Sequence, residues 1–524
     1  MGHDAAHGVD EEEVLMDLRR MGVWEASVNN IAFMSAAFIV PSVFAESGWW
    51  FGISFIAYSA ILTYQTGMIL AQICTERPHL DSYPRVAKEA FRELGEVVLG
   101  WSPGSARGLA SAGLFVVQLM QFLAYYLTGV AELIYLEQYL SQLLHSFDLC
   151  QQQWLLVAAC ISWPFMQIPS FKESKFTAVL TLAMIAFNTS IFTYEVFLVQ
   201  PWACEPAPVY TAPTTAGMIH AASGLAYAFG GHGLYPEQLR EMQNPHRWRE
   251  VMNWTYGIIV PLYYFLGLLG YYAYGSNAHA NLNANYPWNG ANVASLIAQT
   301  LTEVYYVSFS VLALMMQVEL WLGVDPTACC NQGGTIAFGD AAELASYSGL
   351  TGQTEEGFDS VGASSEDSSH EDEEKEEAAS KRRRARELVS CRICGAPPVV
   401  FRTVFRTLFL GSMVLLASSL MGGDGDVLLA LQALAGAVGY LALTYVLPIL
   451  FGWVLLQRQS VAQQIWQGVG VLLGLALICV GSYSCGKDLI ASASSSTSAV
   501  SCHIASDNTF QDGCSAALLS NASS

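Results

Sequence analysis

The segment FGGHGLYPE occupies residues 229–237 and directly follows the apolar and small residues SGLAYA. Three glycines, Gly230, Gly231 and Gly233, surround His232, and Pro236 follows them. Glycine weakens a helix and proline removes a backbone donor, so this cluster predicts a break in a membrane helix. Transporters often bind substrate at such a break. A simple packing kink is the alternative interpretation, because glycine and proline are common in membrane helices.

A second interruption lies near the N-terminus, in NNIAFMSAAFIVPSVFAESGWW at residues 29–50. Ser35, Ala36 and Ala37 are small, and Pro41 follows them. This segment belongs to the first expected membrane span, and the glycine cluster belongs to the sixth. Breaks at equivalent positions of two halves are typical of transporters with internal repeats. The two segments therefore predict an inverted repeat of five plus five helices, with one helix left over.

The composition of the chain is that of a membrane protein. Of its 524 residues, 53% are hydrophobic and 13% are charged, whereas soluble domains have about 25% charged residues. The net charge of −21 is concentrated outside the apolar segments, with eleven acidic residues between positions 355 and 377. A nucleic-acid-binding protein needs a concentrated basic surface, so this charge distribution argues against a nucleic-acid partner.

The apolar segments are long enough to cross a lipid bilayer, which requires about 20 residues. Eleven of them are expected, at residues 25–47, 49–73, 108–138, 153–169, 176–199, 216–232, 251–274, 292–322, 400–420, 427–455 and 464–485. Lys and Arg collect in loops that stay in the cytoplasm. If the N-terminus is cytoplasmic, 22 of the 23 basic residues fall in cytoplasmic connections, and Lys487 is the exception. This asymmetry supports eleven spans and an extracellular or lumenal C-terminus.

The chain thus divides into five parts along its length. We expect an acidic cytoplasmic tail at 1–24, helices one to eight at 25–324, a cytoplasmic loop at 325–398, helices nine to eleven at 399–485, and an extracytoplasmic tail at 486–524. The loop is rich in Ser, Gly and acidic residues, which predicts disorder. It could bind cytoplasmic partners, and its basic end could contact anionic lipid or simply mark the cytoplasmic side. Cysteines of the outer loops and tail, among them Cys150 and Cys485, are able to form disulfides there.

Two expected helices carry a stripe of polar side chains at steps of three and four residues. The third span contributes Gln118, Gln121, Tyr125, Thr128 and Glu132, and the eighth contributes Gln299, Glu303, Tyr306, Ser310 and Gln317. Such spacing places each set on one face of a helix. Polar groups are costly in lipid, so the stripes must line a wet pathway or hydrogen-bond to each other.

Glu303 is a candidate for proton coupling, and Glu132 is a second. Glu303 lies about twelve residues into its span, near the middle of the membrane at 1.5 Å per residue. Its charged form meets a strong desolvation penalty there, as a proton carrier requires. The alternative is a permanently neutral group that lines the helix interface. Glu132, Glu195 and Glu46 lie nearer the outer side and Glu319 lies near the cytoplasm, so these four are weaker candidates than Glu303.

These motifs resemble those of the amino acid/auxin permease family over most of residues 24–323 and, more weakly, over 400–485. The most specific part is FGGHGLYPE with the following REMQNP, which is similar to the family's F-x-F-G-G-H stretch. Three further stretches match: Pro41 to Trp49 followed by YQTGMILAQIC, then DSYPRVAKEAF, and QIPSF at 167–171. The resemblance implies an all-α fold of about eleven helices with helices one and six discontinuous.

The resemblance also implies secondary transport of amino acids or similar solutes. The substrate carboxylate would lie on the exposed backbone of Ser35, Ala36 and Ala37. Gly230, Gly231 and His232 would form the opposite wall, with Phe229 as a gate. The family usually has a G-S-G-like run where this chain has Met34, Ser35 and Ala36, so added bulk is expected at the first break.

The leading hypothesis is a proton-coupled symporter of amino-acid-like solutes, with no cofactor beyond the coupling ion. In a sodium-coupled variant, first-helix carbonyls and hydroxyls such as Ser308 or Ser310 would bind the ion. A non-transporting sensor that signals through the 325–398 loop is another alternative. We find no phosphate loop, nucleophile elbow or metal cluster, so no enzyme activity is expected. The sequence leaves open whether the host membrane is the plasma membrane or an endomembrane.

Overall fold

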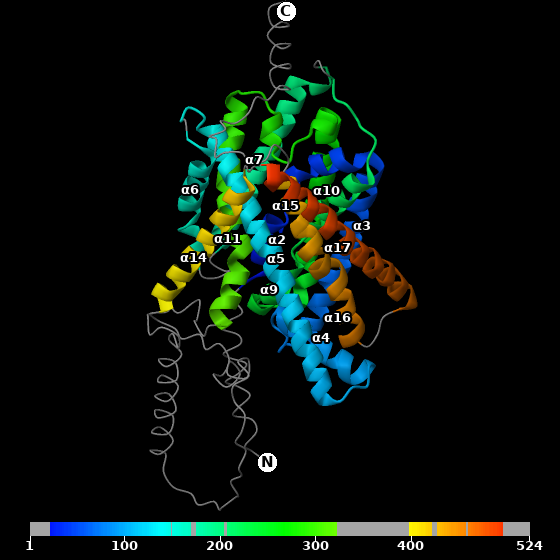
Figure 1. The fold of residues 1–524 in the computed structure, drawn as a ribbon. Helices are drawn as coiled ribbons and strands as arrows, with labels where there is room; N and C mark the ends of the chain where they lie inside the picture. Colours follow the sequence, from blue (N-terminus) through cyan, green and yellow to red (C-terminus); the bar gives the residue numbers. More distant parts are fainter. Residues whose placement is uncertain are drawn as a thin grey trace, which may run out of the picture. The chain divides into compact units, whose positions relative to one another are not determined.

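The computed structural model describes residues 21–147, 149–168, 174–203, 207–321, 398–421, 427–456 and 460–495. These residues form helices and contain no β-strand (Figure 1). They fall into two compact units, each described by itself: a small unit of residues 315–321 and 398–409, and a large unit of all the others. The loop expected to bind cytoplasmic partners, and most of both tails, lie outside the described residues.

Eight helices of the described residues are long and apolar enough to cross a membrane. One of these, Val23–Glu76, contains two expected spans, because Gly48 with φ of 70° interrupts it. The fourth expected span corresponds to α6 (Gln151–Ser162), and the sixth begins with α8 (Thr215–Ala228). Every expected span therefore coincides with helix, and the prediction of a polytopic all-α membrane protein is confirmed.

The remaining helices follow the expected order along the chain. They are α5 (Pro103–Leu143), α7 (Lys175–Val199), α10 (Trp248–Tyr274), α11 (Gly290–Trp321), α14 (Pro398–Leu420), α15 (Val427–Ala435), α16 (Leu447–Leu455) and α17 (Val461–Ser495). A π-helical segment, Gly436–Val446, joins α15 to α16. The last helix runs ten residues beyond its expected end at 485. Cys485 is consequently a buried, free cysteine of α17, whereas Cys150 at the start of α6 is disulfide-bonded.

The two predicted helix breaks are both present. In the first span, α2 (Val23–Phe33) ends before the short turn Ala37–Ile39, and α3 (Val40–Glu76) continues the chain. In the sixth, α8 ends at Ala228 and is followed by the turn His232–Leu234 and by α9 (Tyr235–Glu241). Pro41 and Pro236 stand in the first turn of the helix that follows each break, where proline costs no hydrogen bond.

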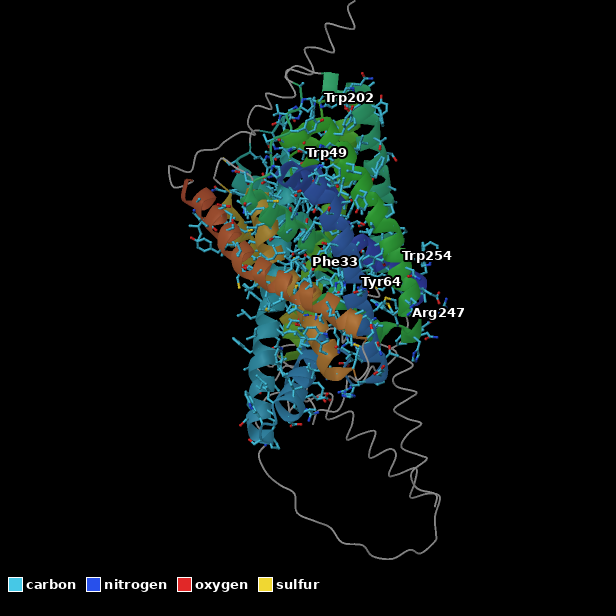
Figure 2. The ribbon with its side chains drawn as sticks, turned by 90° about the vertical axis from the view of Figure 1, so that its right-hand side faces the viewer. Phe33, Trp49, Tyr64, Trp202, Arg247 and Trp254 are labelled. Carbon is cyan, nitrogen blue, oxygen red and sulfur yellow. The ribbon has the colours of Figure 1, made fainter. Side chains whose placement is uncertain are left out.

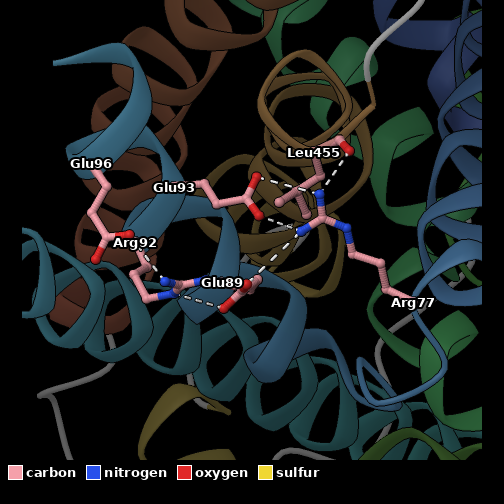
Figure 3. A network of polar contacts seen from close by, with 6 residues as sticks. All are labelled: Arg77, Glu89, Arg92, Glu93, Glu96 and Leu455. Carbon is pink, nitrogen blue, oxygen red and sulfur yellow. Dashed lines mark hydrogen bonds and ion pairs between the residues drawn. The ribbon is translucent and has the colours of Figure 1, made fainter. Parts of the chain in front are cut away.

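A short helix that was not expected, α4 (Tyr83–Glu93), lies between the second and third spans beside α16 (Figure 1). Its apolar face is buried, and the rings of Tyr83 and Phe91 lie 5.8 and 6.3 Å from that of Phe451. Its polar face carries a network of charges around Arg77, the residue after α3 (Figure 3). This network ties the end of α3 to α4, and Arg77 also donates to the Leu455 carbonyl at 3.2 Å.

Tryptophan side chains lie at different heights along the large unit. Figure 2 shows Trp202 and Trp49 in the upper part of the view and Arg247 lower down, with Trp254 at about the same height as Phe33 of the first break. Trp49 packs on Tyr271, with 4.7 Å between ring centroids, and Trp254 is exposed. Tryptophan is enriched where a membrane meets water.

In the small unit, Glu319 of α11 and Arg406 of α14 form a fully buried ion pair. Arg406 Nε lies 2.6 Å from Glu319 Oε1, and Nη2 lies 2.9 Å from Oε2. A bidentate pair of this kind holds both side chains in a defined geometry. Glu319 is therefore engaged in a contact between α11 and α14.

Candidate functional site

A cavity lies in the large unit between the first break, α5, α8, α11 and the tenth span. It measures about 650 Å³, some of it open to solvent. Its polar lining consists of Ser35, Thr128, Glu132, Tyr135, Tyr139, Tyr227, Gln299, Thr302, Glu303, Tyr306, Ser310, Gln432 and Tyr440. The expected stripes of the third and eighth spans thus contribute six of these side chains. Both stripes face the cavity at this depth.

Glu132 of α5 and Glu303 of α11 form a hydrogen-bonded carboxyl pair in the cavity wall. The Tyr227 hydroxyl of α8 also donates to Glu132 Oε1. Both glutamates are buried, and no Lys, Arg or His is found among the described residues that line the cavity. Two carboxyl groups can hydrogen-bond to each other only if one of them carries a proton. The geometry therefore provides a place where one proton is held inside the membrane domain.

The other predicted carboxyl, Glu195 of α7, does not join this pair. Its Oε1 accepts a hydrogen bond from Asn289 Nδ2 at 2.9 Å, and it is absent from the cavity wall. Glu195 is buried like the cavity pair, so burial alone does not separate these carboxyls. The difference lies in the partner: an amide donor in one case and a second carboxyl in the other.

Sequence reasoning missed the contribution of the tenth span. Tyr440 lies in the π-helical segment, and its hydroxyl is 3.0 Å from that of Thr128 across the cavity. Gln432 of α15 accepts a hydrogen bond from the Tyr135 hydroxyl at 3.1 Å. π-Helical turns are rare and occur often at functional sites. A glutamine and a tyrosine inside a strongly apolar span were the available signal.

The predicted binding residues divide into two groups. Ser35, Ala36 and Gly230 line the cavity, so both breaks do open onto it. Ala37, Phe229, Gly231 and His232 do not belong to its wall. The structure therefore brings three of the seven predicted residues to the cavity wall and places the other four outside it.

His232 and Phe229 show where the sixth-span side chains go. His232 Nε2 lies 2.7 Å from the Thr63 carbonyl oxygen and 3.1 Å from the Thr66 hydroxyl, so the ring faces α3. Phe229 packs between Tyr256 and Tyr263 of α10, with 6.1 and 5.1 Å between ring centroids. The expected gate at Phe229 is consequently part of the contact between α8 and α10.

The glycines of the second break serve close packing by tyrosines. A Cβ atom on Gly230 would lie 2.3 Å from Cδ1 of Tyr440, and one on Gly233 would lie 2.3 Å from the Tyr125 hydroxyl. Such distances are far below van der Waals contact. Glycine is required because aromatic side chains approach the backbone from the cavity wall and from α5.

Met34 does not crowd the cavity as the sequence led us to expect. Its side chain is buried on the other side of the break, where the Tyr235 hydroxyl lies 3.5 Å from Sδ. Of the two bulkier residues at the first break, Ala36 alone lines the cavity. The departure from the G-S-G-like run therefore adds one methyl group to the described cavity wall.

A second cavity of about 570 Å³ has Glu46, Thr214 and Ala280 in its wall, and Ala280 lines both cavities. The Tyr135 hydroxyl contacts the Ala280 carbonyl oxygen at 3.3 Å as well as Gln432. These three residues form a layer between the two spaces. Glu46 lines this second cavity. It also lies close to the start of α8, where a Cβ atom on Gly217 would be 2.8 Å from Glu46 Oε2.

The sequence matches the family described as "Transmembrane amino acid transporter protein" over residues 19–485. The chain belongs to this family. The family consists of transporters, in agreement with the expectation that the chain is not an enzyme.

Curated relatives include the vesicular inhibitory amino acid transporter of Mus musculus, 21% identical over 56% of this chain and 54% of that protein. Amino acid transporter AVT1B of Arabidopsis thaliana is also 21% identical, over 56% of this chain and 53% of that protein. The chain thus spans about half the length of the curated relatives it matches. Among solved structures, MhsT in complex with L-phenylalanine has a TM-score of 0.43 at 12% identity, covering 88% of this chain and 98% of that one.

Proposed function

We propose that this protein is a secondary active transporter of amino acids or similar small solutes, coupled to protons and working by alternating access. The observation that carries the proposal is the carboxyl pair of Glu132 and Glu303 in a cavity bounded by two helix breaks. Membership of an amino acid transporter family supports the substrate class. The names of the relatives from mouse and Arabidopsis agree with it.

The cavity offers complementary groups for an amino-acid-like solute. Its carboxyl pair would attract an ammonium group, whereas no described basic side chain is available for a carboxylate. The substrate carboxylate would instead lie against the backbone at Ser35 and Ala36, where the helix is interrupted. The ammonium group would bind the carboxylate that remains ionised while the pair keeps its shared proton, so the loaded site would hold one substrate and one proton together.

Alternating access requires a barrier on each side of the cavity in turn. On the outer side, the layer of Tyr135, Ala280 and Gln432 would open to connect the cavity with the space around Glu46. On the other side, the Tyr125 and Tyr440 rings, 5.8 Å apart, pack against the second break. We propose that these two layers are the outer and inner gates.

The proposed orientation has the N-terminus in the cytoplasm and the C-terminus outside or in a lumen. The disulfide at Cys150 supports it, since this residue lies in a loop expected on the outer side, and disulfides persist in oxidising compartments. The proposal makes no choice between the plasma membrane and an endomembrane.

The proposal is tested by uptake of radiolabelled amino acids into proteoliposomes, over a panel of substrates, with and without an inward proton gradient. Ala36→Leu fills the cavity at the first break, and Ala186→Leu makes the same change at an exposed position of α7. We expect gradient-stimulated uptake by the wild type and by Ala186→Leu, and its loss in Ala36→Leu. Folded wild-type protein that takes up no substrate under proton or sodium gradients would contradict the proposal.

A further inference from the structure

Backbone carbonyl oxygens lie at the C-terminal ends of the two broken helices, α2 and α8. The last carbonyls of a helix lack intrahelical donors and carry the negative end of the helix dipole. In sodium-coupled transporters, carbonyls at such ends coordinate the ion. Here α2 ends at Phe33, with Met34 as its C-cap, and α8 ends at Ala228. These are the oxygens that a cation would use.

One hydroxyl group lies between the two breaks. Tyr263 of α10 is fully buried, and its hydroxyl contacts both the Met34 carbonyl oxygen and the Ala228 carbonyl oxygen, the latter at 2.7 Å. The hydroxyl hydrogen is thus shared between the C-terminal ends of two helices from different halves of the chain. Tyr263 thereby connects the first break to the second with a neutral donor.

A second tyrosine hydroxyl donates to another carbonyl of the first span, that of Ala32, two residues before Met34. The Tyr306 hydroxyl of α11 donates to the Ala32 carbonyl oxygen at 2.8 Å. Of the two eighth-span hydroxyls expected in a sodium site, Ser308 donates to the Val304 carbonyl of its own helix at 2.9 Å. The buried Ser310 hydroxyl lines the cavity and has no hydrogen-bond partner among the described residues. The first-helix carbonyls therefore receive tyrosine hydroxyls from two neighbouring helices.

We propose that the Tyr263 and Tyr306 hydroxyls take the place of a metal cation at the helix breaks, so that sodium neither binds there nor drives transport. A tyrosine hydroxyl directs the positive end of its dipole at the carbonyl oxygens, as a cation would. The Tyr263 hydroxyl lies against the Met34 and Ala228 oxygens, and its ring packs against Phe229 at 5.1 Å between centroids, so a sodium ion bound by both oxygens would have to displace it. The two breaks then keep their relative position at any sodium concentration.

The inference refines the coupling ion of the proposed function, but it can be tested without transport. Thermal unfolding of the detergent-solubilised full chain is measured in sodium chloride and in choline chloride at equal ionic strength, for the wild type, Tyr263→Phe, Tyr306→Phe and Tyr305→Phe. The buried Tyr305 hydroxyl has no hydrogen-bond partner among the described residues and lies on the same helix as Tyr306, so Tyr305→Phe is the matched control.

We expect the wild-type Tm to be the same in both salts, since a ligand raises Tm only if it binds the folded state. Tyr263→Phe and Tyr306→Phe should lower Tm relative to Tyr305→Phe, because each removes a buried hydrogen bond to a backbone carbonyl, although the Ala32 carbonyl keeps the Ser35 N–H at 3.3 Å. A wild-type Tm that rises with sodium concentration would overturn the inference. So would Tm values for both test variants equal to that of Tyr305→Phe.

Uptake gives an independent readout in proteoliposomes. Replacing sodium by choline should leave wild-type uptake unchanged. Tyr263→Phe should reduce uptake by about tenfold, a loss in the range expected for buried polar groups left unpaired. Tyr305→Phe should retain wild-type uptake. Uptake that requires sodium would overturn the inference. A wild type that takes up no substrate at all would instead count against the proposed transport function, and the unfolding result would still decide the role of the two hydroxyls.

Discussion

The protein contains two groups of glutamates that differ in the partner of the carboxyl group, which is a second carboxyl in one group and an arginine in the other. In the cavity, Glu132 and Glu303 hydrogen-bond to each other. At the end of α3 and along α4, glutamates are paired with arginines (Figure 3). There Arg92 Nη2 lies 2.6 Å from Glu89 Oε1, and Arg77 forms an ion pair with Glu93.

The comparison shows that the partner of a carboxyl group, more than its residue type, determines what it can do. The hydrogen bond from Arg92 holds the pKa of Glu89 below its usual range, and nearby positive charges add to the effect. Such a carboxylate stays ionised and serves the packing of α4. No basic side chain lines the cavity in the described part of the chain, and the hydrogen bond between the two carboxyls requires a proton on one of them. Exchange of that proton is the chemistry that a proton-coupled transporter needs.

The largest expected effect follows from removing the acid of the cavity pair. Glu303→Gln should reduce proton-stimulated uptake by at least about tenfold, a typical contribution of a positioned proton-transfer group being a hundredfold or more. Glu195→Gln makes the same change in a buried carboxyl that is hydrogen-bonded to Asn289 and should retain uptake. Uptake assays with and without a gradient measure both. Equal losses in the two variants would show that burial, and not the pairing, matters.

A double variant tests whether Glu132 and Glu303 act as one unit. Because Glu132 and Glu303 share one hydrogen bond, removing both should cost little more than removing Glu303 alone. The measurement is a double-mutant cycle on initial uptake rates with Glu132→Gln, Glu303→Gln and the combination. Losses that multiply would mean that the two carboxyls act separately, and the comparison with the arginine-paired group would then lose its basis.

The arginine-paired group should affect stability and leave transport intact. Arg77→Ala removes an ion pair whose side chains are 27% and 20% exposed, together with the bond to the Leu455 carbonyl. We expect the free energy of unfolding in detergent to fall by about 1 kcal/mol, after allowing for solvent screening. Arg247→Ala, at the exposed pair with Glu250, is the control and should leave unfolding unchanged. A loss of uptake per folded molecule in Arg77→Ala would break the comparison.

The smallest effect concerns acid stability. Since the folded-state pKa of Glu89 is lowered, its contribution is present above the usual carboxyl pKa and is lost as pH falls through the folded-state value. Glu89→Gln should therefore lower Tm slightly at neutral pH and have no effect once the carboxyl is protonated. Tm measured from pH 7 downward for both proteins tests this. A Tm difference between wild type and Glu89→Gln that grows as the pH falls would contradict the prediction.

Local properties of the sequence were sufficient for much of the fold. Span positions depend on the length of apolar segments, and the two breaks at Ser35 and Gly230 depend on residues that disfavour a continuous helix. The polar stripes depend on helical periodicity, which placed Glu303 and Glu132 on the inner faces of their helices. Each of these features is set by residues within a few turns of one another.

The tertiary structure alone decided which groups meet. Where the helix is interrupted, side-chain direction no longer follows a period, so Ser35 and Ala36 line the cavity while His232 faces α3. The tenth span entered the site through a π-helical segment that shifts its register and brings Tyr440 against Gly230. Pairing between Glu132 and Glu303 likewise required helices distant in sequence to pack together, because a hydrogen bond depends on distance in space and not on order along the chain.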